Sequence, residues 1–121
     1  MSQTGSEQPS PVMEVTEQRD GHTLILAISG RVDAVTAKPF ETAVMTPVQG
    51  DATPLVLDLD RLKYISSAGL RVILLAAKQQ KQKNTKFALC NLRDEVRDVF
   101  EISGFAKILD IHPTRDAAVA A

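Results

Sequence analysis

Most of the functional information in the chain lies in nine residues, Tyr64-Ile65-Ser66-Ser67-Ala68-Gly69-Leu70-Arg71-Val72, which join a strand-like run to the most apolar helical stretch. Two hydroxyls therefore lie where a strand passes into the N-terminus of a helix. The first N–H groups of a helix have no partner within it, and the helix dipole is positive there, so this position favours negative charge. A serine in such a place is either a helix cap or a residue that accepts a phosphate, and the rest of the sequence has to distinguish these roles.

Length and composition restrict the class of protein. The 121 residues suffice for one domain with a real core, and 44% hydrophobic and 24% charged residues are typical of a soluble globular protein. A net charge of −1 creates no strong field for nucleic acid, and no apolar run reaches the roughly 20 residues of a membrane span. The single cysteine, Cys90, excludes an internal disulfide and a multi-cysteine zinc site. We therefore expect a cytoplasmic protein without a metal, a cofactor, direct nucleic-acid binding or membrane contact.

Strand-like and helical runs alternate along most of the chain. The polar segment 1–11 reads as a disordered leader, and residues 12–121 read as one folded domain. Asp20-Gly21 predicts a tight turn, so the domain is expected to start with a hairpin. The later alternation favours an α/β fold with parallel strands joined by right-handed crossovers, in a mixed sheet of about four to five strands. The expected strands are 13–16, 23–29, 55–60, 86–91 and 108–111, and the expected helices are 36–46, 67–82, one between 91 and 104, and 114–121.

Local signals predict where several of these elements begin and end. The helix 36–46 is followed by a segment of loop composition, 47–53. Asn91 followed by Asp94 predicts an N-cap with an acidic first turn. Gly104 predicts the end of the helix that begins there, because glycine adopts the left-handed backbone of a C-terminal stop.

Three segments together carry a resemblance to a known family. They are the turn 30–34 with Thr36-Ala37, the strand 55–59 followed by 64–70, and Asn91-Leu92 followed by Val96, 100–105 and Ile108. In this order they resemble the STAS domain (sulphate transporter and anti-sigma factor antagonist), and in particular its small stand-alone bacterial antagonists. The resemblance runs from about Val12 to Ile111 and implies the STAS fold, in which helices pack against a mixed sheet.

The resemblance also implies a function, that of an anti-sigma factor antagonist working by partner switching. In such family members, a loop serine is phosphorylated by an anti-sigma factor that is also a serine kinase, and a serine phosphatase reverses the modification. Aligning the family loop on Gly69 makes Ser67 the phosphoacceptor, with Ser66 as second choice. Ser66 stands where the family usually has an acidic residue, and Ala68 replaces a second hydroxyl. The unphosphorylated protein is expected to bind the kinase, and the phosphorylated protein to release it.

Several residues near Ser67 are candidates for partner contact, and most have a structural alternative. A serine cap contributes about 1 kcal/mol, and the same N–H groups would hold a phosphate, so the two roles are compatible. Asp33, which the family places beside the phosphoacceptor, either contacts the partner or caps the first helix. Gly69 either lets a partner approach or allows close packing beneath the helix, and Arg71, the only charge in an apolar turn, is expected to reach solvent. The predicted partner-binding set is Asp33, Ser66, Ala68, Gly69 and Arg71.

Other functions remain alternatives at this point. With the same fold, the chain could be a non-catalytic scaffold subunit of a signalling or transporter complex. A phosphoacceptor receiver domain would use Asp58 or Asp60 near the end of a middle strand, but the hairpin at Asp20-Gly21 argues against that topology. The sequence contains no nucleophile–base–acid constellation, no Gly-rich phosphate loop and no metal-ligand set, so we expect no enzymatic activity.

Overall fold

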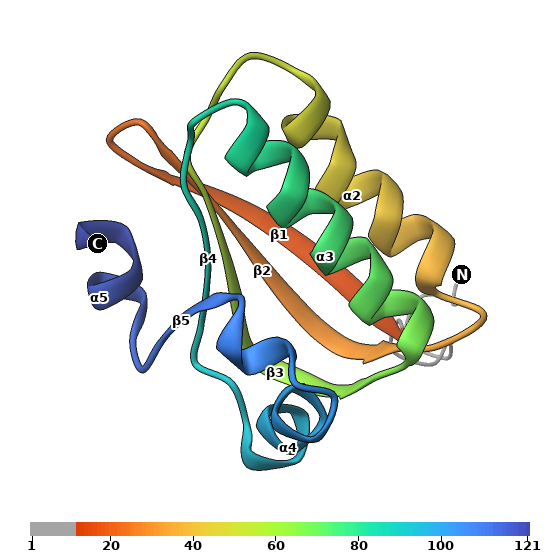
Figure 1. Ribbon diagram of the computed structural model, residues 1–121. Coiled ribbons are helices and arrows are strands. Elements are labelled where there is room, and N and C mark those ends of the chain that lie inside the picture. The colour runs from red at the N-terminus through yellow and green to blue at the C-terminus, as the bar shows by residue number, and fades with distance from the viewer. Residues whose placement is uncertain (1–11) are drawn as a thin grey trace, which may run out of the picture.

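A single mixed sheet forms the centre of the fold (Figure 1). Its strands are β1 (Met13–Asp20), β2 (Thr23–Val32), β3 (Leu55–Ile65), β4 (Phe87–Cys90) and β5 (Asp110–His112). The computed structural model describes residues 12–121, so the leader expected at 1–11 lies outside the described residues. β1 and β2 pair antiparallel around Gly21, whose φ is 62°, and the other neighbouring strands pair parallel. The order β1-β2-β3-β4-β5 confirms the predicted α/β fold, with a hairpin leading into a mixed sheet.

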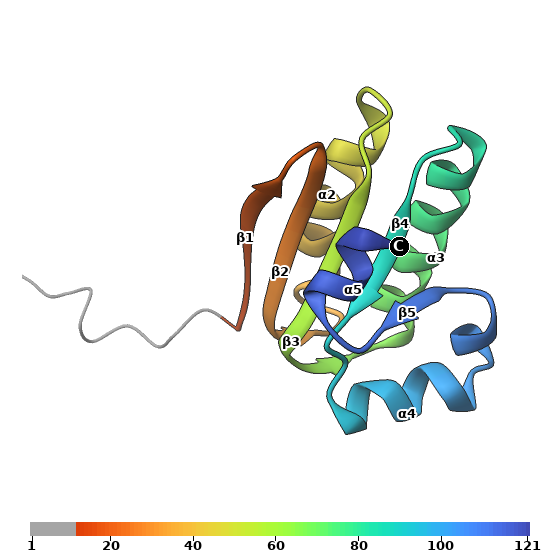
Figure 2. The same ribbon diagram turned by 90° about the vertical axis from the view of Figure 1, so that its left-hand side faces the viewer.

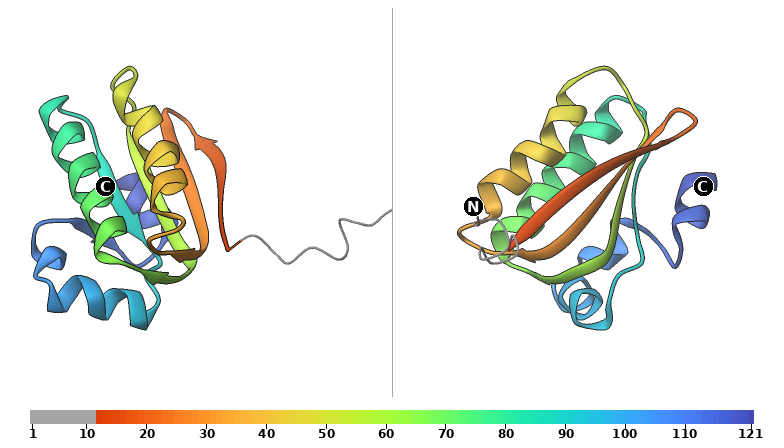
Figure 3. Two further views of the ribbon diagram at one scale, coloured as in Figure 1. Left: turned by 90° about the vertical axis from the view of Figure 1, so that its right-hand side faces the viewer. Right: turned by 180° about the vertical axis from the view of Figure 1, so that it is seen from behind.

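Helices cover the two faces of the sheet unequally. They are α2 (Ala37–Gln49), α3 (Ser67–Gln82), α4 (Asp94–Ile102) and α5 (Arg115–Ala120), with a short 3₁₀ turn η1 (Phe105–Lys107). Figures 2 and 3 show α2 and α3 side by side on one face, α5 on the opposite face, and α4 at one end of the sheet. One large layer and one small layer therefore pack on the same sheet.

Alternation along β3 distributes its side chains between these layers. Leu55, Leu57 and Leu59 point into the main core beneath α2 and α3, whereas Val56 and Asp58 point to the other face. Each fully buried leucine contributes about 1.5–3 kcal/mol through removal of apolar surface from water. The second face holds a small apolar cluster under α5, formed by Ile25, Val56, Ala88, Cys90 and Ala118.

α2 continues past its predicted end, so the predicted loop 47–53 is wrong at its start. Pro47 lies in the last turn of the helix, where it removes one backbone hydrogen bond. Two interactions compensate for that loss. Val48 is fully buried in the main core, and the Lys83 ammonium donates to the carbonyl oxygens of Val48 and Gly50 at the helix end.

Asn91 is not the N-cap of α4, contrary to the prediction. Its backbone is left-handed, with a φ of 59°, and its side-chain amide donates to Asp58 Oδ1 over 3.1 Å. The N-cap is Arg93, which makes no side-chain cap bond, although the first turn is acidic as predicted, beginning at Asp94. Asp58 pairs with Cys90 in the parallel register, so it offers Asn91 a charged acceptor, and a hydrogen bond to a charge is stronger than a neutral one.

The bounds of all five strands differ from the sequence expectation. β1 continues to Asp20 and β2 to Val32, where ends at 16 and 29 were predicted, and β4 is one residue shorter at each end than the predicted 86–91. β3 extends to Ile65 instead of ending at Asp60, because its second half stays paired with β2 after β4 has ended. The last strand is β5, 110–112, where 108–111 was predicted, because η1 occupies the preceding residues. The predicted stop at Gly104 is confirmed by a φ of 83°. The extension of β3 matters most, since it carries the chain to Ser66 at the end of the sheet.

Candidate functional site

The end of β3 is tied to β2 before the chain turns into α3. Val32 and Ile65 are register partners, and the Ser66 N–H donates to the Val32 carbonyl over 2.8 Å. Ser66 is the N-cap of α3, with extended backbone at φ −87° and ψ 173°. Its Oγ accepts the Gly69 N–H at 3.4 Å, which is long for such a bond, so the cap is a weak one.

Ser67 is the first residue of α3, and its side chain is exposed. Among residues 12–121, its hydroxyl has no hydrogen-bond partner. The capping role that the sequence allowed for either serine therefore belongs to Ser66. The Ser67 hydroxyl points into solvent at the positive end of a sixteen-residue helix.

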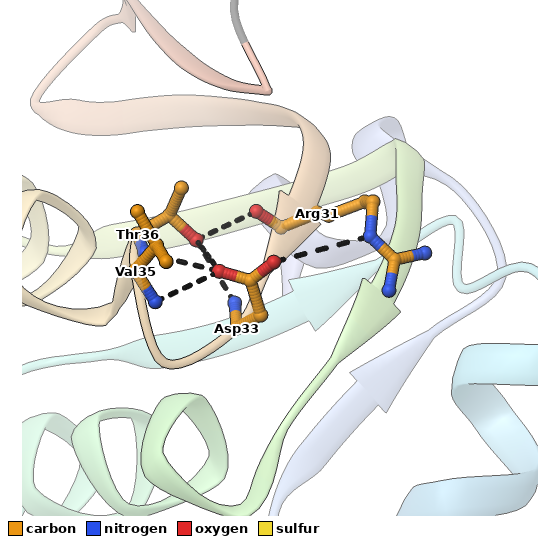
Figure 4. A network of polar contacts seen from close by, with 4 residues as sticks. All are labelled: Arg31, Asp33, Val35 and Thr36. Carbon is orange, nitrogen blue, oxygen red and sulfur yellow. Dashed lines mark hydrogen bonds and ion pairs between the residues drawn. The ribbon is translucent and has the colours of Figure 1, made fainter.

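The turn between β2 and α2 is organised by the Asp33 carboxylate (Figure 4). Its Oδ1 accepts the backbone N–H groups of Val35 at 3.0 Å and of Thr36 at 3.1 Å. The Thr36 hydroxyl accepts the Asp33 N–H at 2.9 Å and donates to the Arg31 carbonyl at 2.8 Å. Asp33 is therefore not the cap predicted for the first helix, because the N-cap of α2 is Thr36 and the Asp33 bonds lie in the turn that precedes it.

Electrostatic surroundings keep Asp33 ionised. The Thr36 N–H bond is the largest cause that lowers the pKa of Asp33, with smaller contributions from Val35 and the Arg31 guanidinium, against an opposing effect of burial. Arg31 Nε lies 4.0 Å from Asp33 Oδ2, and the guanidinium also lies over the Tyr64 ring, 4.5 Å from its centroid. A negative group and a positive group thus lie together at the end of β2.

The two turns lie beside each other because β2 and β3 are parallel neighbours. In the parallel register, Arg31 pairs with Tyr64 and Val32 pairs with Ile65. The helices that follow the two strands, α2 and α3, therefore begin at the same end of the sheet. Figure 1 shows α2 and α3 both starting at this end. Two helix N-termini therefore contribute positive potential to one region of the surface, around Ser67.

Gly69 lies beneath the start of α3 and is buried. A Cβ at this position would lie 2.6 Å from Val32 Cγ1 and 2.7 Å from Ile65 Cγ1. Both distances are shorter than side chains tolerate, so the absence of a side chain lets α3 start close against the two strands. The structure assigns Gly69 this packing role, while its predicted contact with a partner remains a prediction.

A groove of about 320 Å³ runs between α2 and α3, next to this end of the sheet. Arg71 lines it and is exposed, as the sequence predicts for the only charge in an apolar turn. Ala68 lines it as well, so it belongs to the surface beside Ser67. The full lining is Ala34, Ala37, Lys38, Glu41, Ala68, Arg71, Val72 and Leu75.

Sequence patterns did not identify some of the residues that form this surface. Arg31 and Tyr64 form their pair only through the β2–β3 register, which contains two irregularities that a sequence pattern does not reveal. Lys38, Glu41 and Leu75 face the groove because α2 packs beside α3. Helical periodicity identifies the exposed faces of each helix, but it does not pair the helices.

The aspartates of β3 do not form a phosphoacceptor site of the receiver type. Asp58 is 6% exposed, and its Oδ2 accepts from Arg115 Nε at 3.0 Å and from Nη2 at 2.8 Å. Its Oδ1 accepts from Asn91 and from the Asp60 N–H. Together with the β1–β2 hairpin at the sheet edge, this network argues against the receiver alternative.

Two further features of residues 12–121 concern metal binding and membrane insertion. In that range, no three His, Cys, Asp or Glu side chains are grouped so that they could hold a metal ion. None of the helices in the same range is both long and apolar enough to cross a membrane.

Several known proteins that this chain resembles are named as anti-sigma factor antagonists. The putative anti-sigma factor antagonist BtrV of Bordetella bronchiseptica is 44% identical over 109 residues, covering 90% of this chain and 94% of that protein. The crystal structure of an anti-sigma factor antagonist from Mycobacterium paratuberculosis superposes with a TM-score of 0.82 at 25% identity, covering 89% of this chain and 92% of that one.

Two further solved structures are similar to this chain in fold alone. The anti-sigma factor antagonist SpoIIAA in its unphosphorylated form matches with a TM-score of 0.73 at 20% identity, covering 88% of this chain and 93% of that one. The phosphorylated form of the Bacillus protein SpoIIAA matches with a TM-score of 0.67 at 19% identity, covering 88% and 97%.

The match to the family as a whole spans nearly all of the described residues. Residues 14–118 fit the STAS domain family, and this range contains both turns, the groove and the α3 N-terminus described above. The chain belongs to the STAS domain family, and its relatives include proteins named as anti-sigma factor antagonists.

Proposed function

We propose that this protein is an anti-sigma factor antagonist controlled by phosphorylation of Ser67. In the unphosphorylated state it binds an anti-sigma factor that is also a serine kinase, and so frees the sigma factor. After phosphorylation it releases that partner, and a serine phosphatase restores the binding state. The observation that carries the proposal is the exposed Ser67 hydroxyl at the N-terminus of α3, with the cap supplied by Ser66.

The geometry suits Ser67 as the acceptor of a phosphoryl group. Its Oγ would attack the γ-phosphorus of ATP held by the kinase, forming the Oγ–P bond as the bond to the β–γ bridging oxygen breaks. ADP leaves, and the hydroxyl proton passes to a base of the kinase. The chain is the substrate of this step and carries out no chemistry of its own, and the reaction takes place in the cytoplasm, where ATP is available.

The phosphate would act on the partner through charge. Phosphoserine carries about −1.5 to −2 charges at pH 7, and the N-terminus of α3 stabilises them within the free protein. In a partly desolvated interface, the same charge opposes any acidic or apolar surface of the partner. A loss of about 2.7 kcal/mol weakens binding roughly a hundredfold, which is enough for a switch.

The surface around Ser67 offers the features a protein partner needs. The groove between α2 and α3 places Ala68 and Arg71 beside the acceptor, and Asp33 holds the adjacent turn. The relatives named as anti-sigma factor antagonists support a sigma-regulating partner. A protein of the same fold, solved in unphosphorylated and phosphorylated forms, supports a phosphate on this scaffold.

Labelling with a cognate kinase tests the site. The protein is incubated with ATP and a serine kinase anti-sigma factor from the same genome, and the modified residue is located by mass spectrometry. We expect one phosphate on Ser67, none in Ser67→Ala, and undiminished labelling in the matched variant Ser66→Ala. Labelling that persists in Ser67→Ala and disappears in Ser66→Ala would move the acceptor to Ser66.

Binding tests the switch separately. We expect the same kinase to bind the unmodified protein and Ser67→Ala with similar affinity, and Ser67→Glu much more weakly, by isothermal calorimetry without ATP. A stable complex that is indifferent to Ser67→Glu would favour the alternative of a scaffold subunit in a signalling or transporter assembly.

A further inference from the structure

We propose that Arg71 is the internal receptor for the phosphate on Ser67, so that phosphorylation withdraws this arginine from the partner surface. The inference rests on the function proposed above and adds a second element to the switch. Before modification, the guanidinium is available to an acidic group of the partner. After modification, it is bound by the phosphate of its own helix.

The spacing of the two residues carries the inference. Ser67 and Arg71 are four residues apart in α3, and both are exposed. Side chains at this spacing lie on one face of a helix, with Cβ atoms about 5–6 Å apart. The anion would lie N-terminal to the cation, which is the more favourable order for an ion pair within a helix. A guanidinium also binds phosphate oxygens through two parallel hydrogen bonds.

Arg71 is available for this contact in the unmodified protein. In the part of the chain that the structure describes, no carboxylate lies within 4.0 Å of its guanidinium, although Glu41 lines the same groove from α2. Arg31, by contrast, is already engaged by Asp33 and Tyr64. Among the cations near Ser67, Arg71 therefore combines the right spacing with a free side chain.

The same spacing distinguishes the two candidate acceptors. Four residues after Ser66 is Leu70, which is buried in the main core and offers no charge. The Ser66 hydroxyl also accepts the Gly69 N–H at 3.4 Å, whereas the Ser67 hydroxyl has no partner among residues 12–121. A phosphate on Ser66 would gain no arginine, whereas a phosphate on Ser67 leaves the Ser66 cap unchanged and gains Arg71.

Withdrawal of Arg71 alters the groove as well as the acceptor. In the unmodified state, Arg71 and Lys38 line one groove together with Glu41 and apolar side chains, so an acidic segment of the partner fits there. Once Arg71 turns to the phosphate, that segment loses a cation and meets added negative charge. One modification thus removes an attraction and introduces a repulsion.

A titration of the phosphate by ³¹P NMR tests the pairing directly. Phosphoserine is installed at position 67 of the full chain during translation, so the result does not depend on any kinase. A guanidinium about 5 Å away in a water-like medium favours the dianion, and we expect the second pKa of the phosphate to be about 0.5 higher in Arg71→Gln than in the wild type. Arg71→Lys should restore most of the difference, and high salt should reduce it.

A matched variant controls for net charge. Lys78→Gln removes an exposed cation from the same helix, about 16 Å along its axis from Ser67, and should leave the phosphate pKa unchanged. The other charged or titratable groups near this end of α3 are common to all variants: Arg31, Asp33, Lys38, Glu41, Lys63 and Tyr64. Equal pKa values in the wild type and Arg71→Gln would overturn the inference.

A double-mutant cycle provides a second measurement without phosphoserine. Ser67→Glu and Arg71→Gln are combined, and urea unfolding of the four proteins is compared. The introduced glutamate and Arg71 should couple, so that the unfolding equilibrium constant of the double variant differs about twofold from the product of the two single effects. Coupling with no loss of kinase binding in Ser67→Glu would support the pairing of Arg71 with an anion at position 67, and would contradict both its effect on the partner and the proposed function.

Discussion

Adjacent residues at the start of α3 have different surroundings because one precedes the helix and the next begins it. Ser66 is held by the bond from its N–H to the Val32 carbonyl, and its hydroxyl forms a weak cap on the helix. The Ser67 hydroxyl has no such bond among the described residues, and Gly69 fixes how closely both serines approach the sheet. The position of the proposed acceptor therefore depends on a residue that carries no side chain.

Replacing Gly69 by alanine should destabilise the protein by about 1–3 kcal/mol, since the new Cβ would overlap buried side chains of β2 and β3. Urea unfolding measures the change. Gly50→Ala is the matched control, because its Cβ would meet nothing nearer than the Pro47 carbonyl at 3.6 Å and its stability should change by less than about 0.5 kcal/mol. Equal losses in the two variants would show that packing beneath α3 is not the reason for the glycine.

Elements whose boundaries depend on local chemistry could be predicted from the sequence. The β1–β2 turn follows from Asp20-Gly21, and the start of α3 follows from two serines before an apolar run. Boundaries that depend on distant partners could not. Asn91 bonds to Asp58 in another strand, and α2 continues through Pro47 because Lys83 of a later segment holds its end.

The candidate site shows the same division. Asp33 bonds to residues two and three positions away, so a local structural role was visible in the sequence, although the N-cap of α2 is Thr36 and not Asp33. The Arg31–Tyr64 pair requires the β2–β3 register, and the groove beside Arg71 requires α2 and α3 to lie side by side. Both are tertiary properties, which no local pattern contains.

The docking of α5 involves a nearly buried charge, the Asp58 carboxylate. Arg115 donates two hydrogen bonds to Asp58, and the Lys86 ammonium donates to the carbonyl oxygens of Ala118 and Val119 at 2.8 and 2.6 Å. Beneath the helix lies Cys90, which is fully buried. The thiol is therefore a reporter of whether α5 stays in place.

Arg115→Ala should accelerate the reaction of Cys90 with a thiol reagent about tenfold or more. The variant leaves a nearly buried carboxylate without two of its donors, and a loss of about 1.4 kcal/mol in docking increases the open population tenfold. Arg93→Ala serves as control, since its one bond to the Asp60 carbonyl is exposed and 3.4 Å long. Identical rates in the wild type and Arg115→Ala would show that α5 is held by other contacts.

At the scale of the whole molecule, stability should fall in alkaline solution because of the buried thiol. Burial raises the pKa of Cys90 to about 12, from an ordinary value of 9.0. Above pH 9 the unfolded chain loses this proton while the folded protein keeps it, so its stabilising effect is complete below pH 9 and is lost progressively as pH rises toward 12. We expect the free energy of unfolding to fall by about 1.4 kcal/mol between pH 8 and pH 10 from this group alone.

Urea unfolding at the two pH values measures this loss, and Cys90→Ala isolates it. The variant lacks the titrating thiol but keeps every other ionisable group, so its stability should depend less steeply on pH over this interval. The same slope in both proteins would assign the alkaline loss to other groups.

The two faces of the sheet also determine how the protein can be handled in experiments. α5 lies on the face opposite α2 and α3 (Figures 2 and 3). The groove beside Ser67 is lined by residues of α2 and α3 and of the turn before α2, so it is far from α5. A tether attached to the chain after α5 would orient every molecule on a sensor chip in the same way. The surface around Ser67 would then face the flowing solution. Immobilisation at this end would thus separate a true loss of affinity from a loss of access, whereas random coupling through lysines would modify Lys38 in the groove itself.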